Sequence, residues 1–381
     1  MRLGVYTDYE YRSDGTTSYG QRAFVVFLQA LGSGVEQLVL IGRLDPRPGS
    51  SHYPLDDATE LVGLPHYESL ANPLELVRSL PVSLVRLWRL LDRVDTMWVL
   101  GPYPHSVALA LLTIARRRRL VLGVRQDMPA YVRSRRPEKR WMHLGADLLE
   151  AIWKALARRY PVVVVGPELA RKYRRSPRLL QTEVPLVSTR DIAASADVAG
   201  RAYDDELTIL TVGRIDTEKN PLLLAEILAR LLERGRSWRL VVCGEGPLRA
   251  ELERRLAELG VSDHADLKGY VPIDDGLLEL YRSSHAFLHV SLSEGFPQVL
   301  SEAFASRLPV VATAVGGVAG GADGAALLIE PRDAGAAADA LERIATEPEL
   351  RARLIQAGCE RVSQGTLEAA TARVRAFLES A

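Results

Sequence analysis

The sequence has little cysteine and no long apolar run. Only Cys243 and Cys359 occur among the 381 residues, and they lie in different regions of the chain. Two isolated cysteines provide neither a disulfide framework nor a zinc site, so we expect both to be small buried or half-buried residues. No apolar run approaches the length of a membrane span, and the first residues read as a strand rather than as a signal peptide. We therefore expect a cytoplasmic protein, with peripheral contact to the inner face of the membrane as an open alternative.

The net charge of the whole chain is zero, but its two halves carry opposite charges. Residues 1–190 contain 28 basic and 18 acidic side chains, whereas residues 191–381 contain 20 and 30, so the halves carry charges of +10 and −10. This asymmetry indicates two domains with different partners. We do not expect nucleic acid among those partners.

Two ligand-binding motifs are missing. No Asp-x-Asp triplet occurs, so the usual carboxylate clamp for a metal-bound diphosphate is absent, and we expect no metal and no other cofactor. The segment 239–249, RLVVCGEGPLR, has a Gly-x-Gly turn but lacks the third glycine of a dinucleotide fingerprint. We interpret it as a strand and a turn below a nucleotide.

Short apolar segments alternate with helical stretches along the whole chain. Such alternation is typical of an α/β protein with doubly wound sheets, in which ligands bind at the carboxyl ends of the strands. The length suffices for two domains, which we place at 1–190 and 191–365, followed by a final helix at 366–381. Strands are expected at 3–7, 37–41, 95–100, 119–124, 161–165, 207–213, within 239–249, and at 266–271, 286–291 and 309–312. The polar stretch 8–20 is expected to be a loop.

The most informative segment is 291–317, SLSEGFPQVLSEAFASRLPVVATAVGG. It predicts a loop, a helix that starts at Pro297 and runs to about Arg307, and a buried strand. Free N–H groups and the helix dipole make the amino end of such a helix a binding place for phosphate. Glu294 lies in the loop and Glu302 inside the helix, where each can accept hydrogen bonds from ligand hydroxyl groups. A diphosphate that bears a sugar and a ribose fits this arrangement.

A basic pair lies between an earlier strand and helix. Gly213 and Arg214 follow an expected strand, and Lys219 precedes Pro221, which opens an apolar-periodic helix. The fork of Arg214 can grip phosphate oxygens in pairs, while Lys219 supplies a mobile point charge. An exposed basic pair without function is the competing interpretation, and the glutamates downstream favour the phosphate site.

Together these motifs resemble the Glu-x7-Glu signature of retaining, nucleotide-sugar-dependent glycosyltransferases of the GT-B fold, particularly family 4. The matching segments are Glu-Gly-Phe-Pro at 294–297, Ser-Glu-Ala at 301–303, Pro-Val-Val-Ala-Thr at 309–313, Gly-Gly at 316–317, and the pair Arg214 and Lys219. The resemblance is firm over 207–331 and only architectural over 1–190. It implies two Rossmann-like, doubly wound domains that face a central cleft, with the last helix crossing back onto the first domain.

The resemblance also implies an activity and roles for individual residues. It implies a hexosyltransferase-type enzyme (EC 2.4) that moves a sugar from a nucleotide-diphosphate sugar, UDP- or GDP-linked, to a hydroxyl of a glycan, a lipid-linked sugar or a small natural product. Glu294, Arg214 and Lys219 are the implied catalytic residues. The implied donor contacts are Gly15, Arg214, Lys219, Val271, Glu294, Gly295, Phe296, Pro297, Val299, Leu300 and Glu302. The family's reaction implies attack on the face that the diphosphate leaves, and hence retention of anomeric configuration.

The first half departs from the family pattern. Arg125, Gln126 and Asp127 stand where many relatives have a histidine after the corresponding strand. Gln126 cannot act as a base, but it and Asp127 can bind acceptor hydroxyls. We expect His105, at the start of another helix, to be a cap or a surface residue. Gly15 and Thr16 stand where the family usually has a pair of glycines, and an ordinary turn glycine is the alternative interpretation of Gly15.

The segment 128–144, MPAYVRSRRPEKRWMHL, mixes basic and aromatic side chains with proline. It is either a solvated loop, or a surface for an anionic membrane or an anionic acceptor. Three other functions stay open beside the transferase. They are a nucleotide-sugar epimerase of the same fold, a pyridoxal-phosphate-dependent phosphorylase, and a catalytically silent, membrane-docked binding protein.

Overall fold

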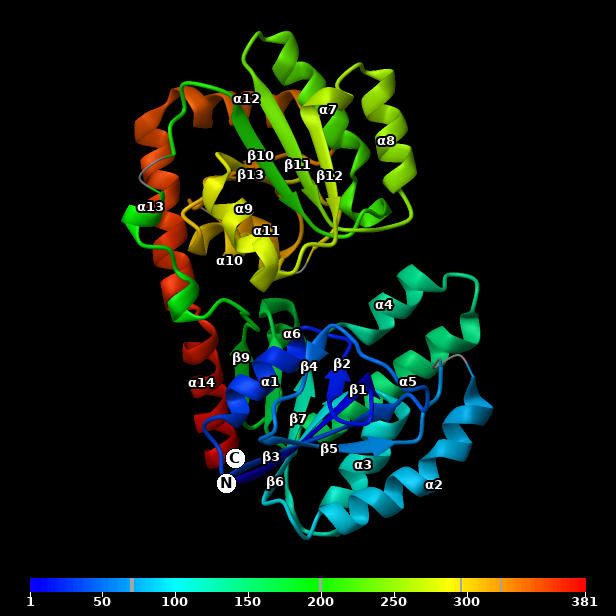
Figure 1. Cartoon of the computed structure of the whole chain (residues 1–381). Coiled ribbons are helices and arrows are strands. Elements are labelled where there is room, and N and C mark those ends of the chain that lie inside the picture. The colour runs from blue at the N-terminus through cyan, green and yellow to red at the C-terminus, as the bar shows by residue number, and fades with distance from the viewer. Residues whose placement is uncertain (69–71, 199–200, 295–296, 323) are drawn as a thin grey trace. The chain divides into compact units, whose positions relative to one another are not determined.

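The computed structural model describes residues 1–68, 72–198, 201–294, 297–322 and 324–381, and it divides the chain into two compact units. Unit 1 comprises Met1–Leu186 together with Leu367–Ala381, and unit 2 comprises Val187–Thr366. The division therefore falls within a few residues of the expected boundaries. Helix α14 (Leu367–Ser380) ends the chain but belongs to unit 1, where it packs against α1 (Phe24–Gly32) (Figure 1).

Unit 1 is built on a nine-stranded mixed sheet. Its parallel strands are ordered β5-β3-β1-β6-β7-β8-β9, and the short strands β2 and β4 add antiparallel pairs. Chain order thus runs outward in both directions from β1, so the topological switch point lies between β1 and β6. The strands are β1 (Arg2–Ser13), β2 (Ser18–Gly20), β3 (Gln37–Leu44), β4 (Tyr53–Pro54), β5 (Thr59–Leu64), β6 (Thr96–Gly101), β7 (Arg119–Val124), β8 (Val162–Val165) and β9 (Leu179–Thr182).

Both faces of this sheet are buried under helices, and successive strand residues point to opposite faces, so neighbouring residues pack into different helical layers. Leu3 and Val5 of β1 pack with α1 and α14, whereas Tyr6 packs with the opposite helical layer, which includes Leu87 and Trp153. The remaining helices of unit 1 are α2 (Pro73–Leu90), α3 (Pro104–Ala115), α4 (Met128–Arg135), α5 (Arg140–Ala157) and α6 (Pro167–Lys172).

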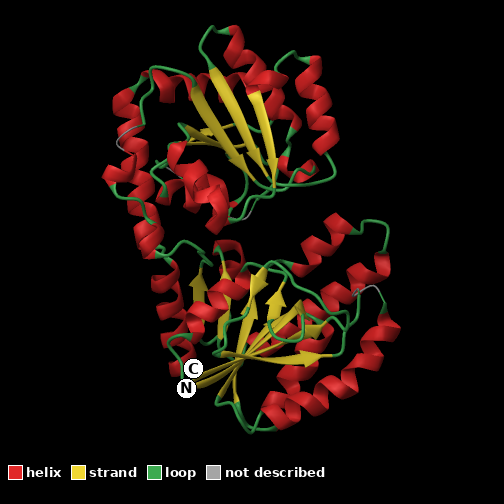
Figure 2. Cartoon of the chain, in the orientation of Figure 1, coloured by secondary structure: helices red, strands yellow, loops and turns green. Residues whose placement is uncertain are grey.

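Unit 2 is a six-stranded parallel sheet with the order β12-β11-β10-β13-β14-β15. Helices surround this sheet (Figure 2). Ile209 of β10 packs on the side of α7 and α12, and the next residue, Leu210, packs on the side of α9 and α10. The elements are β10 (Leu207–Val212), α7 (Leu222–Glu233), β11 (Trp238–Cys243), α8 (Arg249–Glu258), β12 (Ala265–Gly269), α9 (Leu278–Ser283), β13 (Ala286–His289), α10 (Gln298–Ala305), β14 (Val310–Thr313), α11 (Gly317–Gly321), β15 (Ala326–Ile329), α12 (Ala334–Thr346) and α13 (Pro348–Gln364).

Two expected loops are regular structure instead. The stretch 8–20 forms a hairpin, because β1 continues to Ser13 and pairs with β2. The stretch 128–144 is α4 and the start of α5, so the expectation of a solvated loop was wrong. Asp127 accounts for the start of α4, since its side chain accepts a hydrogen bond from the Ala130 N–H and so caps the helix.

His105 and the two cysteines are buried or half-buried side chains. His105 is neither a cap nor a surface residue, because it is buried in α3, stacks on Tyr67 and lies 2.9 Å from the Ser79 hydroxyl. Burial, with a smaller effect of Arg43, lowers the pKa of His105 to about 4. The two cysteines are buried and half-buried, as expected. Among the described residues, every helix is too short or too polar to cross a membrane.

Candidate functional site

Two loops meet at the switch point of the unit 2 sheet. One follows β10 and contains Arg214 to Lys219, and the other follows β13 and contains Glu294. Neighbouring parallel strands bring their carboxyl ends to the same edge, so the sheet order itself brings these loops together. The Leu292 N–H donates to the Glu218 carbonyl at 2.8 Å, which joins the loops through their backbones.

Asp216 shapes the first loop. Its side chain accepts hydrogen bonds from the backbone N–H groups of Glu218 and Lys219, and so caps a single 3-10 turn over Thr217–Lys219. Asn220 then adopts a left-handed conformation with φ of 51° and ends the turn. The turn directs the Lys219 side chain toward Glu294, and Lys219 Nζ donates to Glu294 Oε1.

Glu294 is the centre of the site. Its Oε1 also accepts a hydrogen bond from the Ser291 hydroxyl at 2.7 Å and lies 3.2 Å from His289 Nε2. Burial alone would raise the pKa of Glu294, but the contact with His289, the charge and hydrogen bond of Lys219, and the bond from Ser291 outweigh it and lower the pKa to about 2. Glu294 is therefore ionised at neutral pH, and because a carboxylate only accepts, His289 must carry its proton on Nε2.

Arg214 is held at the rim of the same site. Its guanidinium pairs with Asp216, and its Nη2 lies 3.0 Å from Glu218 Oε2, while the side chain stays 57% exposed. An incoming phosphate must therefore compete with these two carboxylates for the arginine. The mobility of an exposed side chain makes that exchange feasible, since exposed ion pairs are weak.

Close backbone approaches shape the floor of the site. A Cβ on Gly244 would lie 1.9 Å from the Gly213 carbonyl oxygen, and one on Gly246 would lie 2.3 Å from that of Ile215. The Gly-x-Gly turn therefore packs under the loop that carries Arg214 and Lys219. Since a side chain at either glycine would lift that loop, the turn supports the site and need not touch a ligand.

Glu302 lies on α10, as expected, and its Oε2 accepts a hydrogen bond from the Tyr281 hydroxyl at 2.8 Å. Burial raises the pKa of Glu302, and the bond from Tyr281 opposes that rise. Pro297 is the residue before α10 rather than its first residue, and the helix ends at Ala305, two residues before the expected end. Gly295 and Phe296 lie outside the described residues.

A small pocket opens between the two loops and the strand ends. Its lining includes both basic residues of the first loop and all three side chains that contact Glu294 in the described residues. The lining residues are Thr211, Val212, Gly213, Arg214, Ile215, Lys219, Pro221, Leu224, Val242, His289, Val290 and Ser291. Leu300 is fully buried and its N–H already donates to the Pro297 carbonyl at 3.1 Å, whereas Val271 and Val299 are partly buried.

Four residues of this network were missed from the sequence: Asp216, Tyr281, His289 and Ser291. A signal existed for Asp216, because Asp-Thr-Glu-Lys before a proline-led helix is typical of a capped turn. His289 and Ser291 ended an ordinary apolar strand segment, and no local pattern indicated that they face Glu294.

The predicted first-half residues lie in unit 1. Gly15 sits at the exposed tip of the hairpin between β1 and β2, with φ of 100°, which supports the turn-glycine alternative. Gln126 is exposed just after β7. Besides capping α4, Asp127 lies 2.8 Å from Lys172 Nζ. The hydrogen bond and charge of Lys172 oppose the effect of burial, and the pKa of Asp127 is lowered.

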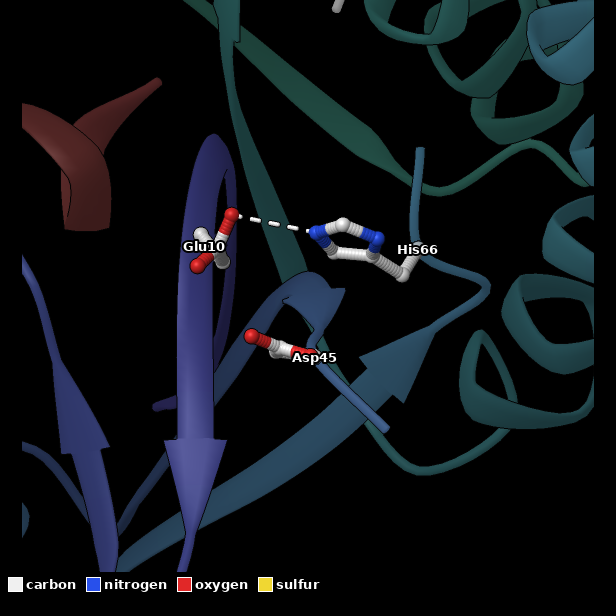
Figure 3. A group of neighbouring side chains, drawn as sticks. All are labelled: Glu10, Asp45 and His66. Carbon is white, nitrogen blue, oxygen red and sulfur yellow. Dashed lines mark hydrogen bonds and ion pairs between the residues drawn. The ribbon is translucent and has the colours of Figure 1, made fainter. Parts of the chain in front are cut away.

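Within the described ranges, one group of side chains combines ligand types that metals use, namely Glu10, Asp45 and His66 (Figure 3). His66 points toward Glu10, with Nε2 3.1 Å from Oε2. The Asp45 carboxylate, however, accepts hydrogen bonds from Arg12 at 2.8 Å and Arg47 at 2.9 Å. Because two guanidinium groups already neutralise this carboxylate and would repel a cation, we interpret the group as an ion-pair network and not as a metal site.

Comparison with known sequences connects unit 2 to one family. Residues 195–361 match the family model described as Glycosyl transferases group 1. D-inositol 3-phosphate glycosyltransferase of Frankia alni is 38% identical over 196 residues, which cover 48% of this chain and 47% of that protein. Alpha-D-kanosaminyltransferase of Streptomyces kanamyceticus is 32% identical over 168 residues, or 40% of each chain. The chain therefore spans less than half the length of these two curated relatives.

Comparison with solved structures covers the whole chain. Sucrose-phosphate synthase from Thermosynechococcus elongatus superposes with a TM-score of 0.73 at 19% identity, covering 100% of this chain and 98% of that one. HepE of Anabaena, solved in complex with UDP, superposes with a TM-score of 0.71 at 14% identity and covers 100% of both chains. At these identities the likeness shows the fold alone, and that fold is GT-B.

Proposed function

We propose that this chain, whose residues 195–361 belong to the glycosyl transferases group 1 family, is a retaining glycosyltransferase that uses a nucleotide-diphosphate sugar. The observation that supports this most strongly is the meeting of Arg214, Lys219 and Glu294 at the switch point of the unit 2 sheet. A guanidinium and an ammonium group beside strand ends suit a diphosphate. The HepE structure with UDP supports a donor of this class, and the name of the Frankia relative supports glycosyl transfer.

Each donor group has a proposed partner. Arg214 and Lys219 bind the diphosphate, and Glu294 binds hydroxyls of the donor sugar once Lys219 turns to the phosphates. Glu302 accepts hydrogen bonds from the ribose. Pro297, Val299 and Leu300 are the proposed contacts at the amino end of α10, where a helix dipole favours negative charge. Gly295, Phe296 and Val271 complete the proposed set of contacts in unit 2.

The proposed chemistry uses no metal. The acceptor oxygen attacks the anomeric carbon on the face that the diphosphate leaves, a carbon–oxygen bond to the diphosphate breaks, and the acceptor proton passes to a phosphate oxygen. Once Arg214 and Lys219 have exchanged their carboxylate partners for the phosphates, they stabilise the charge that develops on the diphosphate, which is electrostatic catalysis. In the part of the chain that the structure describes, the carboxylate partners of Arg214 are Asp216 and Glu218, and both lie on its own loop.

The acceptor is proposed to bind to unit 1. Gln126 is exposed directly after the carboxyl end of β7, the strand that pairs with β6 in that sheet. Its side-chain amide can donate to a sugar hydroxyl. Asp127 has a weaker claim, because its carboxylate already caps α4 and pairs with Lys172. A glycan, a lipid-linked sugar or a small natural product fits these contacts.

Product stereochemistry tests the proposed function. Incubation with a nucleotide sugar and an accepted hydroxyl compound is expected to yield a glycoside with the anomeric configuration of the donor. Proton NMR of the anomeric signal measures that configuration. An inverted product would contradict the front-face mechanism. Release of nucleotide with a free epimerised sugar and no glycoside would instead indicate the epimerase.

We also propose that unit 1 contacts a membrane surface. Ten of the twelve large apolar side chains that are exposed in the described residues lie on α2 to α5 of this unit. On α5, Trp141, Leu144 and Leu148 share one face and are 52%, 72% and 62% exposed. Basic residues surround this row in the segment 128–144. An apolar helix face flanked by arginine and lysine is typical of helices that lie at an anionic lipid surface.

Vesicle flotation tests the membrane contact. Substitution of Leu144 and Leu148 by serine is expected to lower binding to vesicles of phosphatidylcholine and phosphatidylglycerol by about tenfold, because apolar area that enters the lipid is lost. The matched control replaces Tyr270 and Ile273 of unit 2, which are 56% and 46% exposed, by serine. Equal flotation of wild type and both variants would exclude this surface.

A further inference from the structure

A pocket in unit 1 has no role in the proposed donor chemistry. It has a volume of about 350 Å³ and is lined by Lys154, Ala157, Arg158, Arg171, Lys172, Tyr173, Arg174, Arg175 and Ser176. Six of these nine residues are basic and none is acidic. The volume lies at the lower end of the range of ligand pockets, which suits a compact ligand such as a diphosphate group.

The pocket forms where the carboxyl ends of two helices come together. Lys154 lies in the last turn of α5 with Arg158 directly after it, and Arg171 and Lys172 lie in the last turn of α6. Cations near the carboxyl end of a helix are favourable because they complement the helix dipole. That reason applies to each helix separately, and it does not explain why the fold places two such ends around one pocket.

Specific contacts fix the wall between the helices. The hydroxyl of buried Tyr173 donates to Glu150 Oε1 of α5 at 3.0 Å. The Ser176 hydroxyl donates to the Tyr160 carbonyl at 3.2 Å and to the Arg178 carbonyl at 2.9 Å. The turn 173–176 is therefore held against α5, which fixes one wall of the pocket, while the four arginine side chains that line it are exposed.

The charges around the pocket are only partly balanced. Glu150 is 2.8 Å from Lys172 Nζ and 3.8 Å from Lys154 Nζ, and Asp127 is 2.8 Å from Lys172 Nζ. In the part of the chain that the structure describes, Arg158, Arg171, Arg174 and Arg175 have no ion pair with a carboxylate. Four guanidinium groups thus repel one another around one opening, and a multiply charged anion would relieve that repulsion.

The geometry points to a binding site for a phosphate-bearing ligand in this pocket, in addition to the proposed donor site. Arginine forks hold phosphate oxygens in pairs, and several forks around one cavity favour a group with two or more negative charges. That group can be a free diphosphate or the phosphate of a lipid headgroup. The shared chemistry is the phosphate, and the source is decided by experiment.

The first arm of the experiment uses inorganic pyrophosphate. Because pyrophosphate can also enter the donor site, the calorimetric titration is made on Arg214→Ala/Lys219→Ala, which removes both basic residues there. Adding Arg171→Glu and Arg174→Glu is expected to weaken binding by about a hundredfold, since each arginine–phosphate contact contributes roughly tenfold. Arg171→Gln/Arg174→Gln, which changes the charge less, is expected to show a smaller loss of the same kind.

The second arm uses vesicles of phosphatidylcholine with and without phosphatidic acid. If the ligand is a lipid phosphate, the glutamate pair is expected to lose the extra flotation that phosphatidic acid causes, with pyrophosphate binding weak in all variants. Arg230→Glu/Arg254→Glu, an exposed pair in unit 2 with the same change of net charge, is the control. Loss in neither arm, or equal loss in the control, would overturn the proposal. A failure of the donor-site proposal would leave both outcomes unchanged. The first arm already lacks the donor-site arginine and lysine, and the second arm measures flotation without any nucleotide.

Discussion

Replacement of Lys219 by alanine is expected to weaken the binding of nucleoside diphosphate by at least about a hundredfold, as charge-assisted contacts to phosphate are lost. The effect has two parts. The ammonium group no longer reaches the phosphates, and the Glu294 carboxylate, whose side chain is only 12% exposed, is left without its cation and repels them. Calorimetry with UDP, GDP, ADP and dTDP, each with and without magnesium, measures the effect and identifies the base of the donor.

The double variant Lys219→Ala/Glu294→Gln separates these two parts. If the unpaired carboxylate causes much of the loss, the double variant binds the nucleotide more tightly than Lys219→Ala alone, because residues in contact do not contribute additively. Lys268→Ala is the control, since Lys268 is another lysine of unit 2 that lies 2.8 Å from an acidic partner, Asp266. Wild-type affinity in Lys219→Ala, or binding that requires magnesium, would contradict the metal-free donor site.

Much of unit 2 could be predicted from its sequence, because its signals are local. Local signals were sufficient for one strand of unit 1 as well, because β7 begins and ends at the expected residues, 119 and 124. Pro297 and Pro221 indicated the starts of α10 and α7 to within one residue. A proline at a helix start acts through its own fixed φ and its missing N–H, so its effect is visible without the rest of the fold.

The environment of Glu294 could not be predicted in this way. His289 and Ser291 are recognised as partners only when β13 lies beside β10, and the strand order is a property of the whole sheet. The hydrogen bond from Tyr281 to Glu302 has the same origin, because it joins two helices that pack on one face. Tertiary pairing, not local pattern, therefore determines the direction in which the pKa of each glutamate is shifted.

The errors in unit 1 also have a physical cause. The stretch 8–20 is polar, yet it forms a hairpin because Asp14 accepts hydrogen bonds from the Thr16 and Thr17 N–H groups and stabilises a tight turn. His105 is buried although polar residues near helix starts are usually exposed, and stacking on Tyr67 compensates part of that cost. In both cases a few specific contacts overcame the average preference of the residue type.

Substitution of Gly316 by alanine is expected to damage both stability and the donor site. Gly316 has φ of 49° and ψ of −128°, a conformation open essentially to glycine alone. A Cβ there would lie 1.9 Å from the Glu294 carbonyl oxygen, which also accepts a hydrogen bond from the Gly317 N–H at 3.2 Å. Strain and the displaced carbonyl together are expected to lower the free energy of unfolding by roughly 3 kcal/mol.

Gly260→Ala provides the matched comparison for this variant. Gly260 also has a positive φ, 67°, but no other atom lies within 4 Å of a Cβ built there. Alanine at 260 is therefore expected to cost only about 1 kcal/mol, the penalty of the left-handed backbone alone. Urea unfolding gives both costs, and calorimetry gives nucleotide affinity, which should fall in Gly316→Ala and stay unchanged in Gly260→Ala. If Gly316→Ala bound nucleotide as well as wild type, the backbone of the Glu294 loop would not control the donor site, because the substitution must move that loop to be accommodated.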